Sequence, residues 1–172
     1  MMKKILAVVI LLALVGLAAN AATKTATHTV TITVSAIASI AVVGGNVSLA
    51  LGGPASPGAA PTDGTSSTTR LAYTVAGTGN NEVITVNWGA SDAAPAGTQL
   101  QVVATSVGSY GTAAPQVTIS ATAQSFITAI PSSATGTAGV PVLNYTLHVV
   151  SPASLVASST KTATITYTLT AS

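Results

Sequence analysis

Threonine alternates with apolar residues along much of this chain, and that alternation constrains the fold more than any other feature. In Thr27–Val34, threonine occupies every odd position, while His28, Val30, Ile32 and Val34 occupy the even ones. Successive side chains of a β-strand point to opposite faces, so a period of two places one residue type on each face. β-Branched residues also favour strands over helices. The pattern therefore predicts half-buried strands, each with one apolar face.

Segments of the same kind recur at short intervals, separated by turns rich in glycine and proline. The predicted strands are Thr27–Val34, Ile37–Val43, Val47–Leu51, Leu71–Val75, Ile84–Trp88, Leu100–Ala104, Val117–Ala123, Phe126–Ile130, Leu143–Val149 and Ala163–Leu169. Nine or ten short strands that alternate, rather than being apolar throughout, are typical of antiparallel sheets packed face to face. The predicted fold class is all-β, an antiparallel β-sandwich.

Glycine and proline set the expected connections between these strands. Gly44-Gly45-Asn46 is predicted to fold Ile37–Val43 back onto Val47–Leu51 as a hairpin. Gly52–Ser67 is rich in Gly, Pro, Ala and Ser and is predicted to be a long surface loop. An interdomain linker would need a second core beyond it, so we expect a single domain.

The N-terminal residues have the order of a secretory signal peptide. Two lysines precede the apolar run Ile5–Leu17, and the small residues Ala19 and Ala21 flank Asn20. The alternative, a retained membrane helix, would need about 20 apolar residues, and this run is shorter. We therefore expect residues 1–21 to be cleaved, leaving residues 22–172 as one extracellular or cell-surface domain without a membrane span.

Charge is scarce, since only 5% of the residues are charged and the formal net charge is +2. Removal of the two leader lysines leaves equal numbers of basic and acidic residues. Nucleic-acid binding needs a field of Lys and Arg, so we expect no nucleic-acid partner. The chain has no cysteine and thus no disulfide framework. Low charge promotes association, which indicates a chain that assembles, carries glycans or lies packed among neighbours.

The side chains that could support catalysis are few. A nucleophilic triad would need His28 or His148 beside Asp63, Glu82 or Asp92, and the chain has no Gly-x-Ser-x-Gly elbow. The pattern predicts that His148 is solvated on the outer face of its strand and that His28 lies at the rim of the core. Zinc and calcium sites would need paired histidines, cysteines or clustered carboxylates. We therefore expect no enzyme, no cofactor and no metal site.

The aromatic residues mostly follow strand patterns, which predicts that they pack in the core. Only Tyr110, between glycine and serine residues, is expected to be exposed in a loop. A single ring is a weak platform for sugars, so carbohydrate binding is kept only as an alternative. The core candidates are Tyr73, Trp88, Phe126, Tyr145 and Tyr167.

Two segments match the Asn-x-Ser/Thr acceptor pattern, at Asn46 and Asn144. These asparagines are candidate glycosylation sites if the producing cell glycosylates secreted proteins. Surface glycans would explain how a chain with so little charge stays dispersed.

The terminal segments Thr27–Val34 and Thr162–Thr170 lack the proline, inward lysine or bulge that usually protects an edge strand. With the leader and the threonine-rich strands, they resemble subunits of cysteine-free extracellular filaments and fimbria-like, pilin-type surface proteins. The resemblance implies an immunoglobulin-like or pilin-like sandwich. It also implies that a terminal strand of one subunit completes a sheet of the next, with the protein itself as partner.

On this hypothesis, residues 22–34 are an exchanged donor strand whose partner-binding residues are His28, Val30, Ile32 and Val34. A head-to-tail contact of this kind makes a fibre, because it does not close on itself. The alternative is a monomeric adhesion, carbohydrate-binding or surface-layer accessory module that pairs Thr27–Val34 within its own sheet. The sequence leaves open whether the first or the last strand is exchanged.

Overall fold

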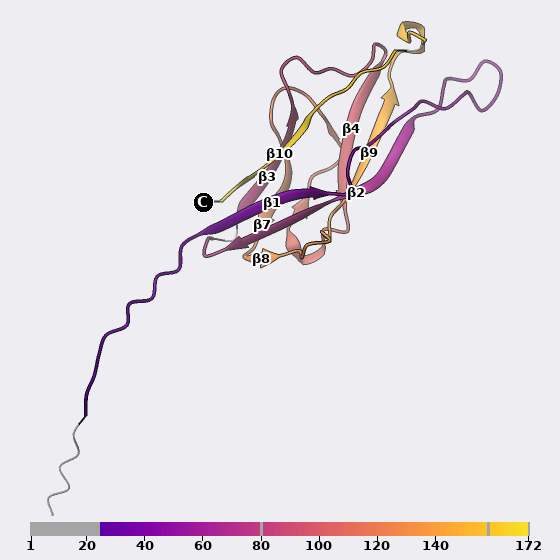
Figure 1. Cartoon of the computed structure of the whole chain (residues 1–172). Coiled ribbons are helices and arrows are strands. Elements are labelled where there is room, and N and C mark those ends of the chain that lie inside the picture. Colours follow the sequence, from indigo (N-terminus) through magenta and orange to yellow (C-terminus); the bar gives the residue numbers. More distant parts are fainter. Residues whose placement is uncertain (1–24, 80, 158, 172) are drawn as a thin grey trace, which may run out of the picture. The chain divides into compact units, whose positions relative to one another are not determined.

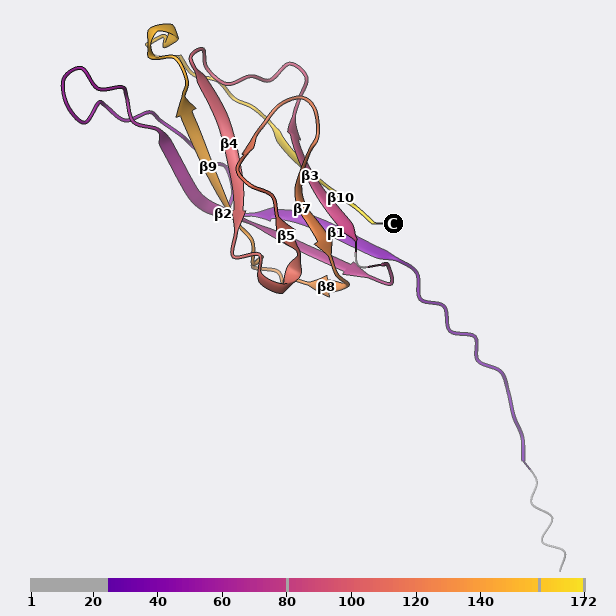
Figure 2. The same ribbon diagram turned by 180° about the vertical axis from the view of Figure 1, so that it is seen from behind.

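The computed structural model describes residues 25–79, 81–157 and 159–171, so the predicted signal peptide lies outside the described residues. The chain divides into two compact units, residues 1–33 and 34–172. In the second unit, two antiparallel sheets pack face to face, which confirms the predicted all-β sandwich (Figures 1 and 2).

The first sheet has the order β1-β2-β9-β4-β6, and the short strand β8 pairs with β2. The second sheet has the order β10-β3-β7-β5. Two short 3-10 turns, η1 and η2, lie between strands. The bounds are β1 Ile37–Val43, β2 Gly64–Ala76, β3 Glu82–Trp88, β4 Thr98–Thr105, η1 Gly108–Tyr110, β5 Thr112–Ala113, β6 Val117–Thr118, β7 Gln124–Ile130, β8 Ser133–Ala134, β9 Val142–Val149, η2 Pro152–Ser154 and β10 Ile165–Thr170.

The core lies between the sheets and follows the predicted alternation. In β2, Leu71, Tyr73 and Val75 are buried while their neighbours are exposed or half-buried. In β3, Ile84 and Val86 are buried in the same way. Each strand therefore contributes one apolar face, and neither sheet could shield that face from water without the other.

A tyrosine pair joins the central strand β9 of the first sheet to the edge strand β10 of the second. The hydroxyls of Tyr145 in β9 and Tyr167 in β10 are 2.8 Å apart and share a hydrogen bond. The ring of Tyr167 also packs on Phe126 of β7, with 5.4 Å between ring centroids. Burial raises the pKa of Tyr167, because the phenolate would lose its hydration. These contacts fix the edge strand β10 against the core.

The predicted hairpin between Ile37–Val43 and Val47–Leu51 is wrong. Strand β1 pairs instead with the second half of β2, with Ile40 opposite Tyr73. Gly44 and Gly45 do have positive φ angles, so the chain bends there as expected. Val47–Leu51 alternates without forming a strand. The chain does not turn back on β1 after this bend but continues beside β2, since Gly44 lies against the backbone of Thr68 and Ala50 lies against Gly64.

Two other boundaries also differ from the prediction. The loop expected over Gly52–Ser67 ends earlier, because β2 begins at Gly64 and an isolated bridge between Gly52 and Thr62 closes the loop's base. Of the predicted strand Val117–Ala123, only the first two residues form a strand, β6, which pairs with β4, and Ile119 adds one backbone hydrogen bond to Leu100. Alternation marks residues that can form a strand, whereas a ladder also needs a neighbouring backbone.

We expect Tyr167→Phe to lower the free energy of unfolding by about 1 kcal/mol, because the hydroxyl of Tyr145 loses its partner in a partly buried position. Urea unfolding followed by circular dichroism measures the change. Tyr145→Phe/Tyr167→Phe should cost less than the sum of the single variants, since it removes both partners. Additive single and double variants would show that the hydrogen bond does not couple the sheets.

Candidate functional site

The described part of the N-terminal segment, residues 25–36, forms no strand. Val30 is 66% exposed, Ile32 82% and Val34 75%. His28 is exposed too, rather than lying at the rim of the core as predicted. Thr27–Val34 was predicted to be a strand, and it pairs with no strand of the described residues. Three alternating aliphatic side chains in water are unfavourable unless another surface covers them.

The edge of the first sheet is poorly covered. Opposite residues of an antiparallel pair share a face, so the register of β1 places Ile40 and Val42 on the same face as Tyr73 and Leu71. Tyr73 and Leu71 are buried, yet Ile40 is only half-buried and Val42 is 47% exposed. The core-side face of β1 therefore extends beyond the cover that the second sheet provides.

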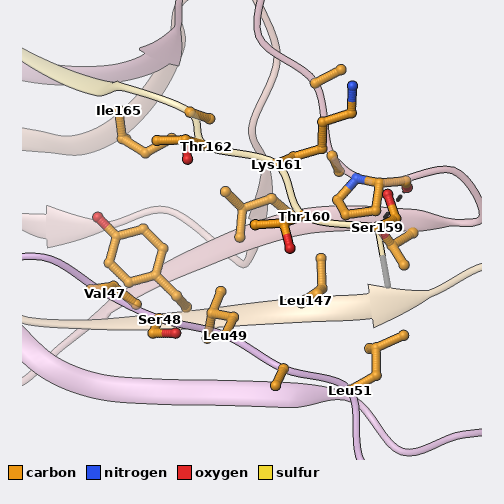
Figure 3. A pocket seen from close by; sticks show the side chains of 18 of the residues that line it. Val47, Ser48, Leu49, Leu51, Leu147, Ser159, Thr160, Lys161, Thr162 and Ile165 are labelled. Carbon is orange, nitrogen blue, oxygen red and sulfur yellow. Dashed lines mark hydrogen bonds between the residues drawn. The ribbon is translucent and has the colours of Figure 1, made fainter. Parts of the chain in front are cut away.

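A groove of about 1350 Å³ opens on this side of the sandwich. One wall is the segment 46–53, and the other is the segment 159–165 that leads into β10 (Figure 3). The floor includes Leu100 of β4, with Tyr145 and Leu147 of β9. The groove reaches Trp88, the only tryptophan in the chain. Apolar side chains of both sheets line part of it, and most of the remaining lining comes from the segments 45–53, 93–96, 155–157 and 159–164.

Both walls of the groove are extended but lie outside the strand ladders. In the first wall, Val47, Leu49 and Leu51 are half-buried while Ser48 and Ala50 are exposed. Period-2 burial of this kind is strand-like, although the segment belongs to no strand of the described structure. The walls therefore present strand-like edges to the groove.

The second wall is tethered at its end, where the backbone N–H of Thr164 donates to Asp92 Oδ2 at 3.0 Å. The same carboxylate oxygen accepts from the backbone N–H of Gly89 at 3.2 Å. Asp92 thus holds the turn after β3 to the start of β10. Thr69, at the border of the groove, is buried, and its Oγ1 has no hydrogen-bond partner among the residues that the structure describes.

The structure brings His148 and Asp63 together, although His148 was predicted to be solvated. His148 Nδ1 lies 2.8 Å from Asp63 Oδ2, and the backbone N–H of Val149 donates to Asp63 Oδ1 at 2.9 Å. The hydrogen bond from His148, followed by that from Val149, lowers the pKa of Asp63. The carboxylate thereby ties the loop before β2 to the end of β9.

This pair matches part of a hydrolytic triad, but its geometry supports anchoring. Over the described ranges, the only side-chain partner of His148 in a hydrogen bond is Asp63, so no hydroxyl is positioned as a nucleophile. The described residues also contain no cluster of three His, Asp or Glu side chains suited to a metal ion. Glu82 is fully buried in β3 of the second sheet, whereas His148 lies in β9 of the first sheet.

The candidate glycosylation sites differ in accessibility. Asn46 is exposed on the wall of the groove. Asn144 is half-buried in β9, and its Nδ2 donates to Thr105 Oγ1 at 2.7 Å. Since a glycan is attached through that nitrogen, Asn46 is the better placed of the two.

The aromatic residues follow the predicted pattern with two differences. Phe126, Tyr73 and Tyr145 are buried as expected. Trp88 and Tyr167 are only partly buried and border the groove. Tyr110, expected to be exposed, is half-buried in η1, and its carbonyl accepts a hydrogen bond from the Tyr73 hydroxyl at 2.8 Å.

We expect Asp63→Asn to lower the melting temperature at neutral pH. The loss in free energy of unfolding should be less than about 1 kcal/mol, because the pair is exposed. The folded state lowers the pKa of Asp63, so its contribution is present above the pKa of the unfolded chain. It is lost as the pH falls through the folded pKa. Thermal melts from pH 7 to strongly acidic pH should therefore converge for the two proteins. A constant difference at every pH would show that the charge plays no part.

Among the described residues, no helix has the length and apolar character needed to span a membrane. The groove, the exposed N-terminal segment and the Asp63–His148 anchor are the features from which a function can be inferred. Comparison with known protein families, curated proteins and solved structures finds no match to this chain.

Proposed function

We propose that this chain is a structural subunit of an extracellular filament or pilus, not an enzyme, and that it assembles head-to-tail by β-strand complementation. The donor is the segment of residues 22–34. The observation that carries the proposal is the exposure of Val30, Ile32 and Val34, which alternate like a core strand but belong to no sheet of the described residues. The leader expected from the sequence supports export to the cell surface.

Burial of these side chains supplies a driving force for assembly. Each fully buried Val or Ile side chain contributes roughly 1.5–3 kcal/mol. Backbone hydrogen bonds to a sheet edge would add to this and fix the register. Residues 25–36 contain no carboxylate or ammonium, so burial of residues 25–34 desolvates no such charge, and Lys24 lies just before them.

The geometry of such a contact leads to a polymer. The donor segment and any sheet edge that accepts it are different surfaces of the molecule, so the contact is heterologous. Each subunit that joins then leaves one donor and one acceptor of the assembly free for the next subunit. The low charge of the chain also limits repulsion between successive subunits.

The aromatic border of the groove favours a second candidate, a monomeric secreted carbohydrate-binding or adhesion module. Trp88 and Tyr167 offer ring surfaces there, and aromatic rings stack on the apolar faces of sugars. This candidate does not account for the exposed alternation of Val30 and Ile32. A monomeric protein that binds glycans through Trp88 would favour it over the filament.

We expect the chain from residue 22 onward to form uniform filaments by negative-stain electron microscopy and a heat-resistant ladder on denaturing gels. Val30→Asp/Ile32→Asp should abolish both, because the burial of two aliphatic side chains is replaced by the burial of two charges. Deletion of residues 22–34 should have the same effect.

The matched control is Thr29→Asp/Thr31→Asp, which adds the same charges on the opposite face of the segment and should retain filaments. Circular dichroism checks that every variant is folded. Filaments from Val30→Asp/Ile32→Asp, or a dispersed monomer from the unmodified chain, would contradict the proposal.

A further inference from the structure

The open groove has the size and form of a site for a chain segment. Its volume of about 1350 Å³ exceeds the roughly 300–1,000 Å³ of typical small-molecule pockets. Figure 3 shows the two extended walls, with Val47, Leu49 and Leu51 on one side and Thr160, Thr162 and Ile165 on the other. A site that runs between two extended backbones is suited to a third extended backbone.

The backbone of the walls favours the same occupant. The segments 46–51 and 160–164 belong to no ladder of the described structure, although the backbone of Ala50 in the first segment lies beside Gly64 of β2. A strand in the groove could pair with either wall, as in strand addition at a sheet edge. It would also lie beside Thr69, whose buried Oγ1 has no hydrogen-bond partner in the described part of the chain.

The side chains of the groove fit one particular pattern. Its floor of Leu100, Tyr145 and Leu147 would accept aliphatic side chains from one face of a strand. The opposite face of that strand would point to solvent and would need polar residues. Lys161 is the one charged residue that lines the groove, and it is exposed. A neutral segment with aliphatic residues at every second position and threonine between them meets these requirements.

We infer that this groove is the acceptor site for residues 27–34 of a second copy of the chain. The inference rests on the proposed function and names its partner surface. Val30, Ile32 and Val34 lie on the apolar floor, and Thr29, Thr31 and Thr33 face outward. The inserted strand fills the gap between the wall 46–51 and the wall 160–164 and so completes the sandwich.

The absence of cysteine and the single tryptophan make this site measurable. The acceptor is the chain from residue 22 carrying Val30→Asp/Ile32→Asp, which cannot donate its own segment. The probe is a synthetic peptide of residues 25–36, which contains no tryptophan. We expect the peptide to shift the emission of Trp88 to shorter wavelength, with saturation, because it excludes water from the groove. The same peptide with Ile32→Asp should bind about tenfold more weakly or worse.

Disulfide trapping locates the peptide without relying on fluorescence. Ser48→Cys and Thr162→Cys place one thiol on each wall, and peptides with Thr29→Cys, Thr31→Cys or Thr33→Cys sample the register. A disulfide needs Cα atoms roughly 4.4–6.8 Å apart, so it reports adjacent strands. We expect at least one wall to be trapped at one register. Matched controls on the other exposed edges are Ser39→Cys in β1, Thr112→Cys in β5 and Thr118→Cys in β6, which should remain untrapped.

A groove variant tests the same site in filaments of the full chain. Leu49→Asp introduces a charge into the wall and should prevent filaments, whereas Val150→Asp changes an exposed aliphatic residue outside the groove and should not. Because the side chain of Leu49 packs against the core, circular dichroism must show that the Leu49→Asp variant is folded. If it is unfolded, trapping in otherwise unmodified filaments, by Ser48→Cys/Thr31→Cys and Thr162→Cys/Thr31→Cys, replaces it.

The outcomes separate the acceptor site from the filament itself. Two results would show that the groove is not the acceptor site while leaving the filament proposal intact. One is trapping at Ser39, Thr112 or Thr118 in place of the walls, and the other is filament formation by a folded Leu49→Asp variant. The acceptor site would also be contradicted by a peptide that leaves the emission of Trp88 unchanged and is trapped on neither wall. A monomer in which Thr31→Cys is trapped on a wall of its own chain would show that each groove holds its own segment. That result would contradict insertion of a segment from a second copy. Peptide trapped in the groove of a protein that never forms filaments would support the site and contradict the filament.

Discussion

The structure depends on the mutual burial of two sheets whose strands are each apolar on one face only. Leu71, Tyr73 and Val75 of β2 lie against Ile84 and Val86 of β3 within one cluster, so neither sheet shields its apolar face alone. No disulfide reinforces this contact, since the chain has no cysteine. At the edge, the Tyr145–Tyr167 hydrogen bond and the packing of Tyr167 on Phe126 hold β10 in place. Any exposed part of either apolar face is therefore a defect in the main stabilising interaction.

The open groove is such a defect, and it lies where the two sheets stop covering each other. The first sheet ends at β1 and the second at β10, and the segments 46–53 and 159–164 beside these edge strands belong to neither sheet. Val42, Val47 and Leu49 consequently remain partly exposed. The exposed residues Val30 and Ile32 carry the same alternation without a sheet. The groove and the exposed segment are complementary in pattern, and on the proposed function strand exchange between copies would cover the apolar side chains of both.

The polar side chains of the chain serve the architecture. Asp92 ties the turn after β3 to the start of β10, and Asp63 ties the loop before β2 to the end of β9. Both carboxylates thus connect segments that are far apart in the sequence, and each accepts a backbone N–H.

Period-2 alternation in the sequence determined the all-β class, the inward faces of β2, β3 and β9, and the apolar face of Val30, Ile32 and Val34. These are local properties, because the side-chain direction follows from the strand backbone itself. Alternation does not determine which strands pair with each other. Val47–Leu51 alternates as well as β1 does, yet β2 pairs with β1. The Asp63–His148 contact joins residues 85 positions apart, and no local pattern signals it. The groove, too, arose only in the tertiary structure, because it is the space left when two sheets of unequal extent pack, and that extent depends on which backbones find a neighbour.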